Sequence, residues 1–145
     1  MYGFVRDVLA EKGSQVLTTP VGASVRDAVR SMNEAGIGSL LVIQHGQPVG
    51  IFTERDALQR VMDVGLDPER TRIGDVMTVD MLTVAPATPA DEAMEIMTES
   101  RCRHLPVVDN GSLVGLVSIG DLMRWVLIHQ REDIQYMHDY INGRV

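Results

Sequence analysis

The sequence predicts a mixed α/β (α+β) protein that consists of two β-α-β-β-α units in tandem and a long C-terminal helix. One observation is an internal repeat, in which the second half of the chain matches the first at a spacing of 65 positions. Another is that apolar runs of strand length alternate with stretches of helical periodicity. A third is that no Pro or Gly interrupts residues 121–141. Because each unit begins strand–helix–strand, its first two strands should be parallel with a right-handed crossover.

The clearest part of the repeat is a short segment that occurs twice. GIFTERD (residues 50–56) and GLVSIGD (residues 115–121) both read Gly, two apolar residues, a hydroxyl residue, two variable residues and Asp. The alignment holds without a gap from about residues 16 and 81 to residues 61 and 126, so the chain is a duplicated unit. We expect the first repeat over residues 1–64, a linker over 65–72, the second repeat over 73–127 and a helical extension over 128–145.

The first copy has clear start and stop signals. Gly13 can end the first helix and Gly36 the second, and the unbroken apolar run over 40–43 is typical of a strand that is buried on both faces. The expected elements are a helix over 5–11, a strand over 16–19, a helix over 24–35, strands over 40–43 and 49–52 joined by a turn at 45–48, and a helix over 53–64.

The second copy repeats this order. Pro89 suits the first position of a helix, and Asn110-Gly111 is a strong signal of a two-residue hairpin turn. The expected elements are a helix over 73–77, a strand over 81–84, a helix that begins at Thr88-Pro89, strands over 105–108 and 113–117, and a helix that follows Ser118.

That last helix, or two helices in series, should continue to Asn142-Gly143. Its apolar residues recur at spacings of three and four and need a partner surface. Two interpretations stay open: the helix packs on its own chain, or it mediates self-association.

Composition excludes several functions. A net charge of −7 disfavours nucleic-acid binding, since such proteins usually carry a basic face. Cys102 is the single cysteine, which excludes an intramolecular disulfide and suits a reducing cytoplasm; we expect it to be a small buried side chain. Residues 1–10 have no apolar run typical of a signal peptide, and no stretch is long enough to cross a membrane. We expect no metal site, because the four His have no ligand spacing with one another or with Cys102. We expect no catalytic residues, because the sequence shows no pairing of a nucleophile with a base, and no nucleotide-phosphate loop is present.

The repeated Thr53-x-x-Asp56 and Ser118-x-x-Asp121 have two interpretations. Ser or Thr followed by an acid three residues later is the pattern of a capping box, which pairs the free N–H groups of a helix start. The same position, at the end of a strand and the start of a helix, also favours an anion, and an Asp carboxylate can accept hydrogen bonds from a ribose diol. The repeated Gly before each segment indicates a close backbone approach.

Together these features resemble the tandem cystathionine β-synthase (CBS) domain pair, or Bateman module. The resemblance covers about residues 5–126 and rests on GIFTERD, GLVSIGD and RHLPVVD (residues 103–109). It is strongest to small free-standing members whose last helix runs past the second repeat. It implies two repeats related by pseudo-two-fold symmetry, and commonly a homodimer in which four repeats form a disc, with residues 73–77 and 119–126 as contact surfaces.

The resemblance also implies a regulatory module without catalysis, which binds AMP first, or ATP, ADP or NAD(H), and senses energy or redox state. The alternative is a scaffold or dimerisation protein that binds no ligand. Adenine nucleotides would occupy two clefts between the repeats. Ribose would meet Asp56 and Asp121, phosphate would meet Thr53, Ser118 and possible cations Arg55 and Arg103, and adenine and the cleft walls would involve Leu17, Thr18, Leu82, Thr83, Ile37, Gly38, Ser39, His104, Leu105 and Pro106.

The two copies differ at one wall. Arg103 and His104 stand where the first copy has Gly38 and Ser39, and an arginine can make a bidentate phosphate contact. We therefore expect one tight and one weak site, or a single ligand that draws its phosphate contacts from the second copy.

Overall fold

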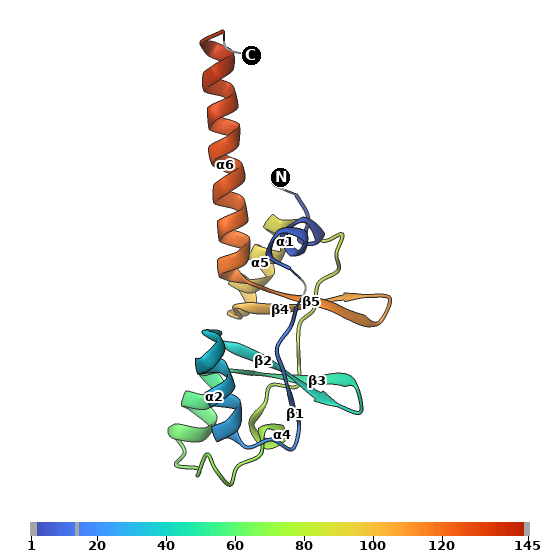
Figure 1. Ribbon diagram of the computed structural model, residues 1–145, viewed down its shortest axis with the longest axis vertical. Coiled ribbons are helices and arrows are strands. Elements are labelled where there is room, and N and C mark those ends of the chain that lie inside the picture. Colours follow the sequence, from blue (N-terminus) through green and yellow to red (C-terminus); the bar gives the residue numbers. More distant parts are fainter. Residues whose placement is uncertain (1–2, 14, 144–145) are drawn as a thin grey trace. The chain divides into compact units, whose positions relative to one another are not determined.

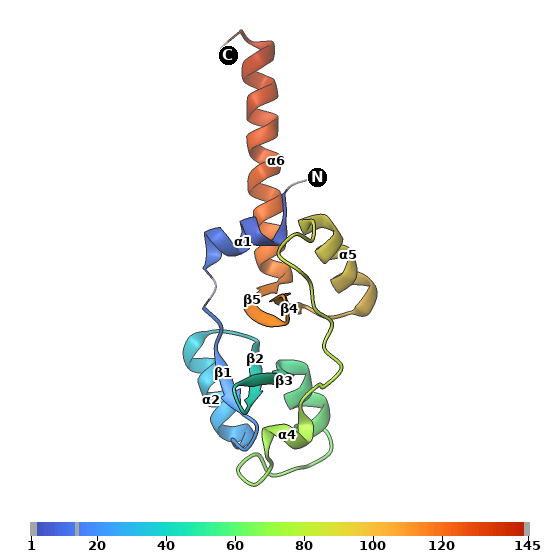
Figure 2. The same ribbon diagram turned by 90° about the vertical axis from the view of Figure 1, so that its right-hand side faces the viewer.

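The computed structural model describes residues 3–13 and 15–143, which form two compact units (Figures 1 and 2). One unit joins Met1–Gln15 to Leu82–Val145, and the other is Val16–Met81. The units do not coincide with the sequence repeats. Helix α1 (Val5–Lys12) belongs to the unit that contains the second copy, whereas α4 (Ile73–Val76) belongs to the unit that contains the first copy.

The unit of residues 16–81 is built around a three-stranded sheet of order β1-β2-β3. Strand β1 is parallel to β2, as expected from the strand–helix–strand pattern, and β2 is antiparallel to β3. The elements are β1 (Thr18–Pro20), α2 (Val25–Ala35), β2 (Ser39–Gln44), β3 (Gln47–Thr53), α3 (Glu54–Asp56), the π-helical η1 (Ala57–Met62) and α4. The core comprises Val25, Ala28, Met32, Leu40, Val42, Phe52, Val61, Ile73 and Val76.

Local sequence explains most of these boundaries. The Ser24 hydroxyl accepts a hydrogen bond from the Asp27 N–H (3.1 Å) and caps α2, and Gly36 ends that helix in the left-handed conformation (φ 65°). His45 and Gly46 both have positive φ (52° and 74°), which is the geometry of a type I′ hairpin turn. The expected helix over 53–64 is instead one α-helical turn followed by a π-helical segment, in which the Asp63 N–H donates to Leu58 O.

The other unit contains α1, α5 (Ala90–Ser100), β4 (His104–Asp109), β5 (Ser112–Ser118) and α6 (Ile119–Ile141). Strands β4 and β5 form an antiparallel hairpin whose turn residues Asn110 and Gly111 have φ of 51° and 79°, as the Asn-Gly signal predicts. The core of this unit comprises Val5, Val8, Leu9, Val84, Ala90, Ala93, Met97, Leu105, Val107, Val117 and Leu122.

Two local predictions for this unit were wrong. The strand expected over 81–84 is reduced to a single bridge, in which Val84 lies parallel to Val107. The segment then turns away, because Pro86 O and Thr88 O accept hydrogen bonds from the first turn of α1. Pro89 is the residue before the first turn of α5 rather than its first helical residue.

Helix α6 runs without a break from Ile119 to Ile141, which settles the choice between one helix and two. Leu122 anchors it in the core of its unit, and Cys102 is half-buried against the same core. In both views, the C-terminal half of α6 extends away from α1 and α5 of the same unit. No helix among the described residues is long and apolar enough to span a membrane.

Candidate functional site

Both repeated segments end a strand and begin a helix. Thr53 is the last residue of β3 and precedes α3, and Ser118 is the last residue of β5 and precedes α6. In the first copy, the Thr53 N–H donates to Asp56 Oδ2 (3.0 Å) and the Asp56 N–H donates to Thr53 Oγ1 (3.3 Å). In the second, the Ser118 N–H donates to Asp121 Oδ2 (2.9 Å) and the Asp121 N–H donates to Ser118 Oγ (3.1 Å). Each segment is therefore a capping box.

The first carboxylate is buried and fully engaged inside its own unit. Asp56 is 5% exposed. The Thr78 hydroxyl donates to both of its oxygens (3.1 and 3.3 Å), and Arg60 Nε lies 3.5 Å from Oδ1. A ligand that used this carboxylate would have to replace these partners, and a desolvated carboxylate loses free energy whenever a partner is removed without replacement.

The second carboxylate has a different partner, which comes from the far end of the sequence. Lys12 Nζ, on the last turn of α1, donates to Asp121 Oδ2 (2.6 Å) and to Leu116 O (2.8 Å). The Asp121 side chain is 16% exposed and the Lys12 side chain 30% exposed, so water reaches this ion pair. Lys12 was not among the residues predicted for the site.

In both copies, one residue donates hydrogen bonds to the Asp carboxylate and to a backbone carbonyl of the preceding strand, but the donor groups differ. In the first copy, the Thr78 N–H donates to Ile51 O (2.8 Å) while the Thr78 hydroxyl donates to Asp56. Leu116 is the repeat equivalent of Ile51, and Lys12 joins its carbonyl to Asp121 with one ammonium group. A neutral hydroxyl and a backbone amide in one copy are thus replaced by a positive charge in the other.

Lys12 and Ser118 together lower the pKa of the Asp121 carboxyl. Burial by itself would raise the pKa of the Asp121 carboxyl. The hydrogen bond from Lys12 and the bond from the Ser118 N–H, with the Lys12 charge and the Ser118 hydroxyl, outweigh burial and lower that pKa below its usual value of 3.8. Asp121 is therefore a stable anion at neutral pH.

The residues beside the two helix starts also differ in charge. In both copies an equivalent backbone hydrogen bond joins the first residue of the helix to the residue at the start of the hairpin: the Glu54 N–H donates to Gly38 O (3.1 Å), and the Ile119 N–H donates to Arg103 O (2.8 Å). In the first copy the Glu54 carboxylate lies over Gly38, since a Cβ added there would be 2.8 Å from Glu54 Oε1. The second copy has Arg103 and an uncharged Ile119 at these positions, so it is basic where the first copy is acidic.

The remaining predicted residues divide between the units. The first set lies in the unit of residues 16–81, where Leu17, Thr18 and Arg55 are exposed and Ser39 is buried and pairs with Thr53. The second set lies with α6, where Leu82, Thr83 and Arg103 are exposed and His104 pairs with Ser118. The side chains of Leu105 and Pro106 are buried, so these two residues present only backbone groups. Ile37 and Gly38 are half-buried.

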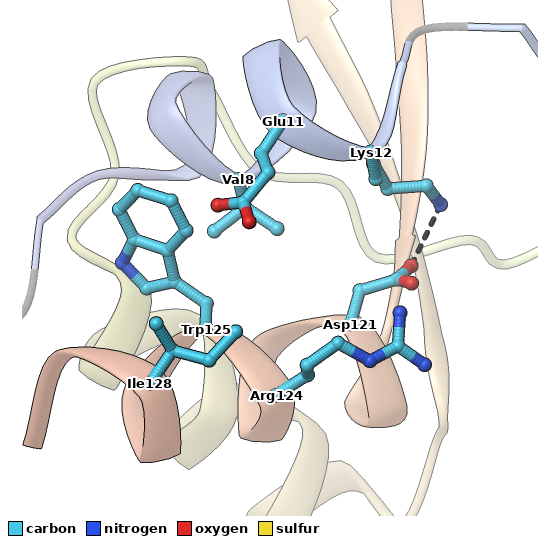
Figure 3. Close-up of a pocket in the computed structure, with 7 residues that line it drawn as sticks. All are labelled: Val8, Glu11, Lys12, Asp121, Arg124, Trp125 and Ile128. Atoms are coloured by element: carbon cyan, nitrogen blue, oxygen red, sulfur yellow. Dashed lines mark hydrogen bonds and ion pairs between the residues drawn. The ribbon is translucent and has the colours of Figure 1, made fainter. Parts of the chain in front are cut away.

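A pocket of about 200 Å³ opens beside Asp121, between α1 and α6 (Figure 3). Val8, Trp125 and Ile128 form its apolar part, and Glu11, Lys12, Asp121 and Arg124 form its polar part. Ligand sites for drug-sized molecules usually measure about 300–1,000 Å³, so this pocket is too small to enclose a nucleotide. Among the residues that the structure describes, no group of three or more His, Cys, Asp or Glu could hold a metal ion.

Comparisons with known proteins agree on one family. A family model described as CBS domain matches residues 5–63 and 73–128. The chain is 37% identical over 148 residues to the mitochondrial CBS domain-containing protein CBSX3 of Arabidopsis thaliana, covering 96% of this chain and 72% of that protein.

Solved structures give the same result. A candidate signal-transduction protein with CBS domains from Burkholderia ambifaria is 40% identical, with a TM-score of 0.85 over 88% of this chain and 96% of that chain. The CBS domain pair of protein MJ0100, in complex with methylthioadenosine and S-adenosyl-L-methionine, is 25% identical, with a TM-score of 0.73 over 84% of this chain and 98% of that chain.

Proposed function

Because the chain belongs to the CBS-domain family, with two CBS domains in tandem, we propose that it is a regulatory module that binds an adenine nucleotide and has no catalysis of its own. AMP is the ligand we expect first, followed by ATP or ADP and by NAD(H). The MJ0100 pair, which binds two adenosine-containing molecules, supports this class of ligand. With its nucleotide bound, the module would signal energy or redox state to a partner.

The observation that carries the proposal is the Ser118, Asp121 and Lys12 cluster at the start of α6. A carboxylate that stays ionised can accept hydrogen bonds from both hydroxyls of a ribose. A phosphate would lie near the Ser118 hydroxyl and the first N–H groups of α6, where the helix dipole favours an anion. Arg103 adds positive charge to the same copy.

Ligand binding then requires Lys12 to move. The ribose hydroxyls would take the place of the Lys12 ammonium on Asp121, and the released ammonium would be available to the phosphate. This exchange would weaken the link between α1 and α6, which gives the nucleotide a direct effect on both helices. A nucleoside without a phosphate would displace Lys12 without compensating its charge, so AMP should bind more tightly than adenosine.

The first copy would provide the weaker site. Its carboxylate is held by Thr78 and Arg60, and the Glu54 carboxylate stands near the position where Arg103 stands in the second copy. Thr53, Asp56, Arg55, Leu17, Thr18, Ile37, Gly38 and Ser39 would line this weaker site. Ser118, Asp121, Arg103, His104, Leu82, Thr83 and the backbone of Leu105 and Pro106 would line the stronger one.

A scaffold without ligand is the second candidate function, and one observation favours it. Both carboxylates already accept hydrogen bonds from groups of this chain, so each segment can serve as a helix cap alone. In either case we propose a cytoplasmic homodimer. Helix α4 has little apolar surface to offer that dimer, because Ile73 and Val76 are buried inside their own unit. Helix α6 is therefore the better candidate for the dimer contact.

The test is to identify what the folded protein retains. Mass spectrometry of the protein purified under native conditions, together with thermal unfolding in AMP, ATP, NAD and adenosine, should show an adenine nucleotide and a higher melting temperature. AMP at about 100 times its Kd should add about 2.7 kcal/mol of stability, or roughly 5–10 °C for a protein of this size. No retained nucleotide and no shift with any of these ligands would favour the scaffold.

A further inference from the structure

The outer part of α6 carries an apolar stripe that its own unit leaves uncovered. Met123, Leu127, Ile134, Met137 and Ile141 are all exposed, from 48% at Met123 to 78% at Ile141. Large apolar residues scattered singly are normal on a surface, but a continuous row along one helix is typical of an interface.

The spacing of the stripe is that of a coiled coil. Its members follow one another at intervals of four, three, four, three and four residues, and Gln130 completes the series. These are the intervals of a heptad, with Leu127, Ile134 and Ile141 at the a positions and Met123, Gln130 and Met137 at the d positions. At about 100° per residue, the six positions lie within an arc of about 80°, so a straight helix presents them together.

The stripe does not coincide with the face that α6 uses inside its unit. Leu122, which is buried, lies about 100° around the helix from the middle of the stripe. Trp125 and Ile128, which line the pocket, lie on the opposite side. The core and the pocket can therefore stay as they are while the stripe is covered by another molecule.

We propose that this stripe is an interface with a second copy of the chain, in which the two α6 helices form a short parallel coiled coil. It extends the α6 contact of the homodimer proposed above along the rest of the helix, and it does not depend on nucleotide binding. A coiled coil of two helices is favoured over one of three or four, because β-branched Ile134 and Ile141 occupy a positions and no β-branched residue occupies a d position.

Polar residues beside the stripe favour one orientation. In a parallel pair, Asp133 at g faces His138 at e of the second copy, whose ring N–H can donate to the carboxylate, and Gln130 meets Gln130, so the two amides can hydrogen-bond to each other. In an antiparallel pair with all six layers matched, Arg131 would face Arg131, Asp133 would face Asp133, and Gln130 would lie against Ile134. Like charges and an unpaired buried amide both disfavour the antiparallel pair.

Sedimentation equilibrium of the full chain tests the interface. Ile134→Glu places a charge in the middle of the stripe, and Tyr136→Glu is its matched control because Tyr136 is 61% exposed and Ile134 62% exposed on the same helix. We expect Ile134→Glu to raise the dissociation constant of self-association at least tenfold, and Tyr136→Glu to change it less than threefold. Gln130→Leu should lower it. Equal constants for the two Glu variants, or a monomeric wild-type chain at all concentrations, would overturn the proposal.

Cross-linking tests the orientation. In a Cys102→Ser background, Ile141→Cys places one thiol near the C-terminal end of each stripe. A parallel pair brings the two thiols together, so mild oxidation should give a disulfide-linked dimer, whereas Asp139→Cys, on the outer side of the helix, should not. An antiparallel pair separates the Ile141→Cys thiols by about the length of the stripe and would give no such dimer. Unchanged thermal shifts with AMP in Ile134→Glu would show that the interface and the nucleotide site are independent.

Discussion

Lys12 Nζ lies 2.6 Å from Asp121 Oδ2, although 109 positions separate the two residues in the sequence. This ion pair attaches the end of α1 to the start of α6 within one compact unit. It also occupies the carboxylate that a ribose would use. The structural role of the pair and its proposed role in ligand binding can therefore be tested with the same variants.

The first prediction concerns the strength of this ion pair. Lys12→Met removes the ammonium and introduces the residue that stands at the equivalent position of the other copy, Met77. Because water reaches the pair, the loss of unfolding free energy should be small, about 0.5–1 kcal/mol at pH 7. Urea unfolding of Lys12→Met, Asp121→Asn and the double variant measures the coupling. A double variant whose loss equals the sum of the two single losses would show that the residues are not coupled.

The second prediction concerns pH. The pKa of Asp121 is lowered in the folded state, so the stabilisation is fully present above the usual carboxyl pKa of 3.8. It is lost as the pH falls through the depressed pKa of the folded protein. The difference in unfolding free energy between wild type and Lys12→Met should therefore be constant from pH 7 to about 5 and shrink below about 4. A difference that grew on acidification would contradict the assignment.

The third prediction concerns the two repeated glycines. A Cβ on Gly50 would lie 2.9 Å from the backbone oxygen of Thr78 and 2.5 Å from Met77 Sδ, whereas a Cβ on Gly115 would meet the flexible tip of Leu9 at 2.8 Å. Gly50→Ala should therefore cost more, about 1–3 kcal/mol, and Gly115→Ala should cost clearly less. Chemical denaturation measures the stability loss of both variants. A larger loss in Gly115→Ala than in Gly50→Ala would contradict the backbone contact assigned to Gly50.

The fourth prediction concerns phosphate recognition. Arg103→Ala should weaken AMP binding about tenfold or more while leaving adenosine binding within a factor of about two, because a charge-assisted contact to phosphate is lost and nothing else changes. Isothermal titration with both ligands measures the two effects. Arg101→Ala provides a neighbouring control in which a positive charge is removed outside the predicted wall. Equal loss of AMP and adenosine in Arg103→Ala would mean that Arg103 acts through folding.

Local signals in the sequence predicted much of the fold. The mixed α/β class with a long C-terminal helix and the resemblance to CBS domains are both confirmed. Ser24 and Gly36 bound α2 as their residue types suggest, and Asn110-Gly111 forms the expected turn. These features depend on a few neighbouring residues, which a sequence displays directly.

Long-range packing was less accessible. Nothing in the periodicity of residues 5–11 shows that α1 joins the unit of the second copy, or that Lys12 reaches Asp121 there. One signal existed, because extending the 65-residue alignment backward places Lys12 at the position of Met77, next to Thr78. The prediction of a strand over 81–84 was wrong for a similar reason, because α1 donates backbone hydrogen bonds to the segment that follows Val84.

The most direct measurement of the central claim is AMP binding by two isosteric variants. Asp121→Asn and Asp56→Asn each remove one carboxylate charge, while the amide oxygen can still accept the capping N–H. If the second copy is the nucleotide site, isothermal titration will show AMP binding weakened at least tenfold in Asp121→Asn and little changed in Asp56→Asn. Binding that is unchanged in Asp121→Asn, or lost only in Asp56→Asn, would contradict the account.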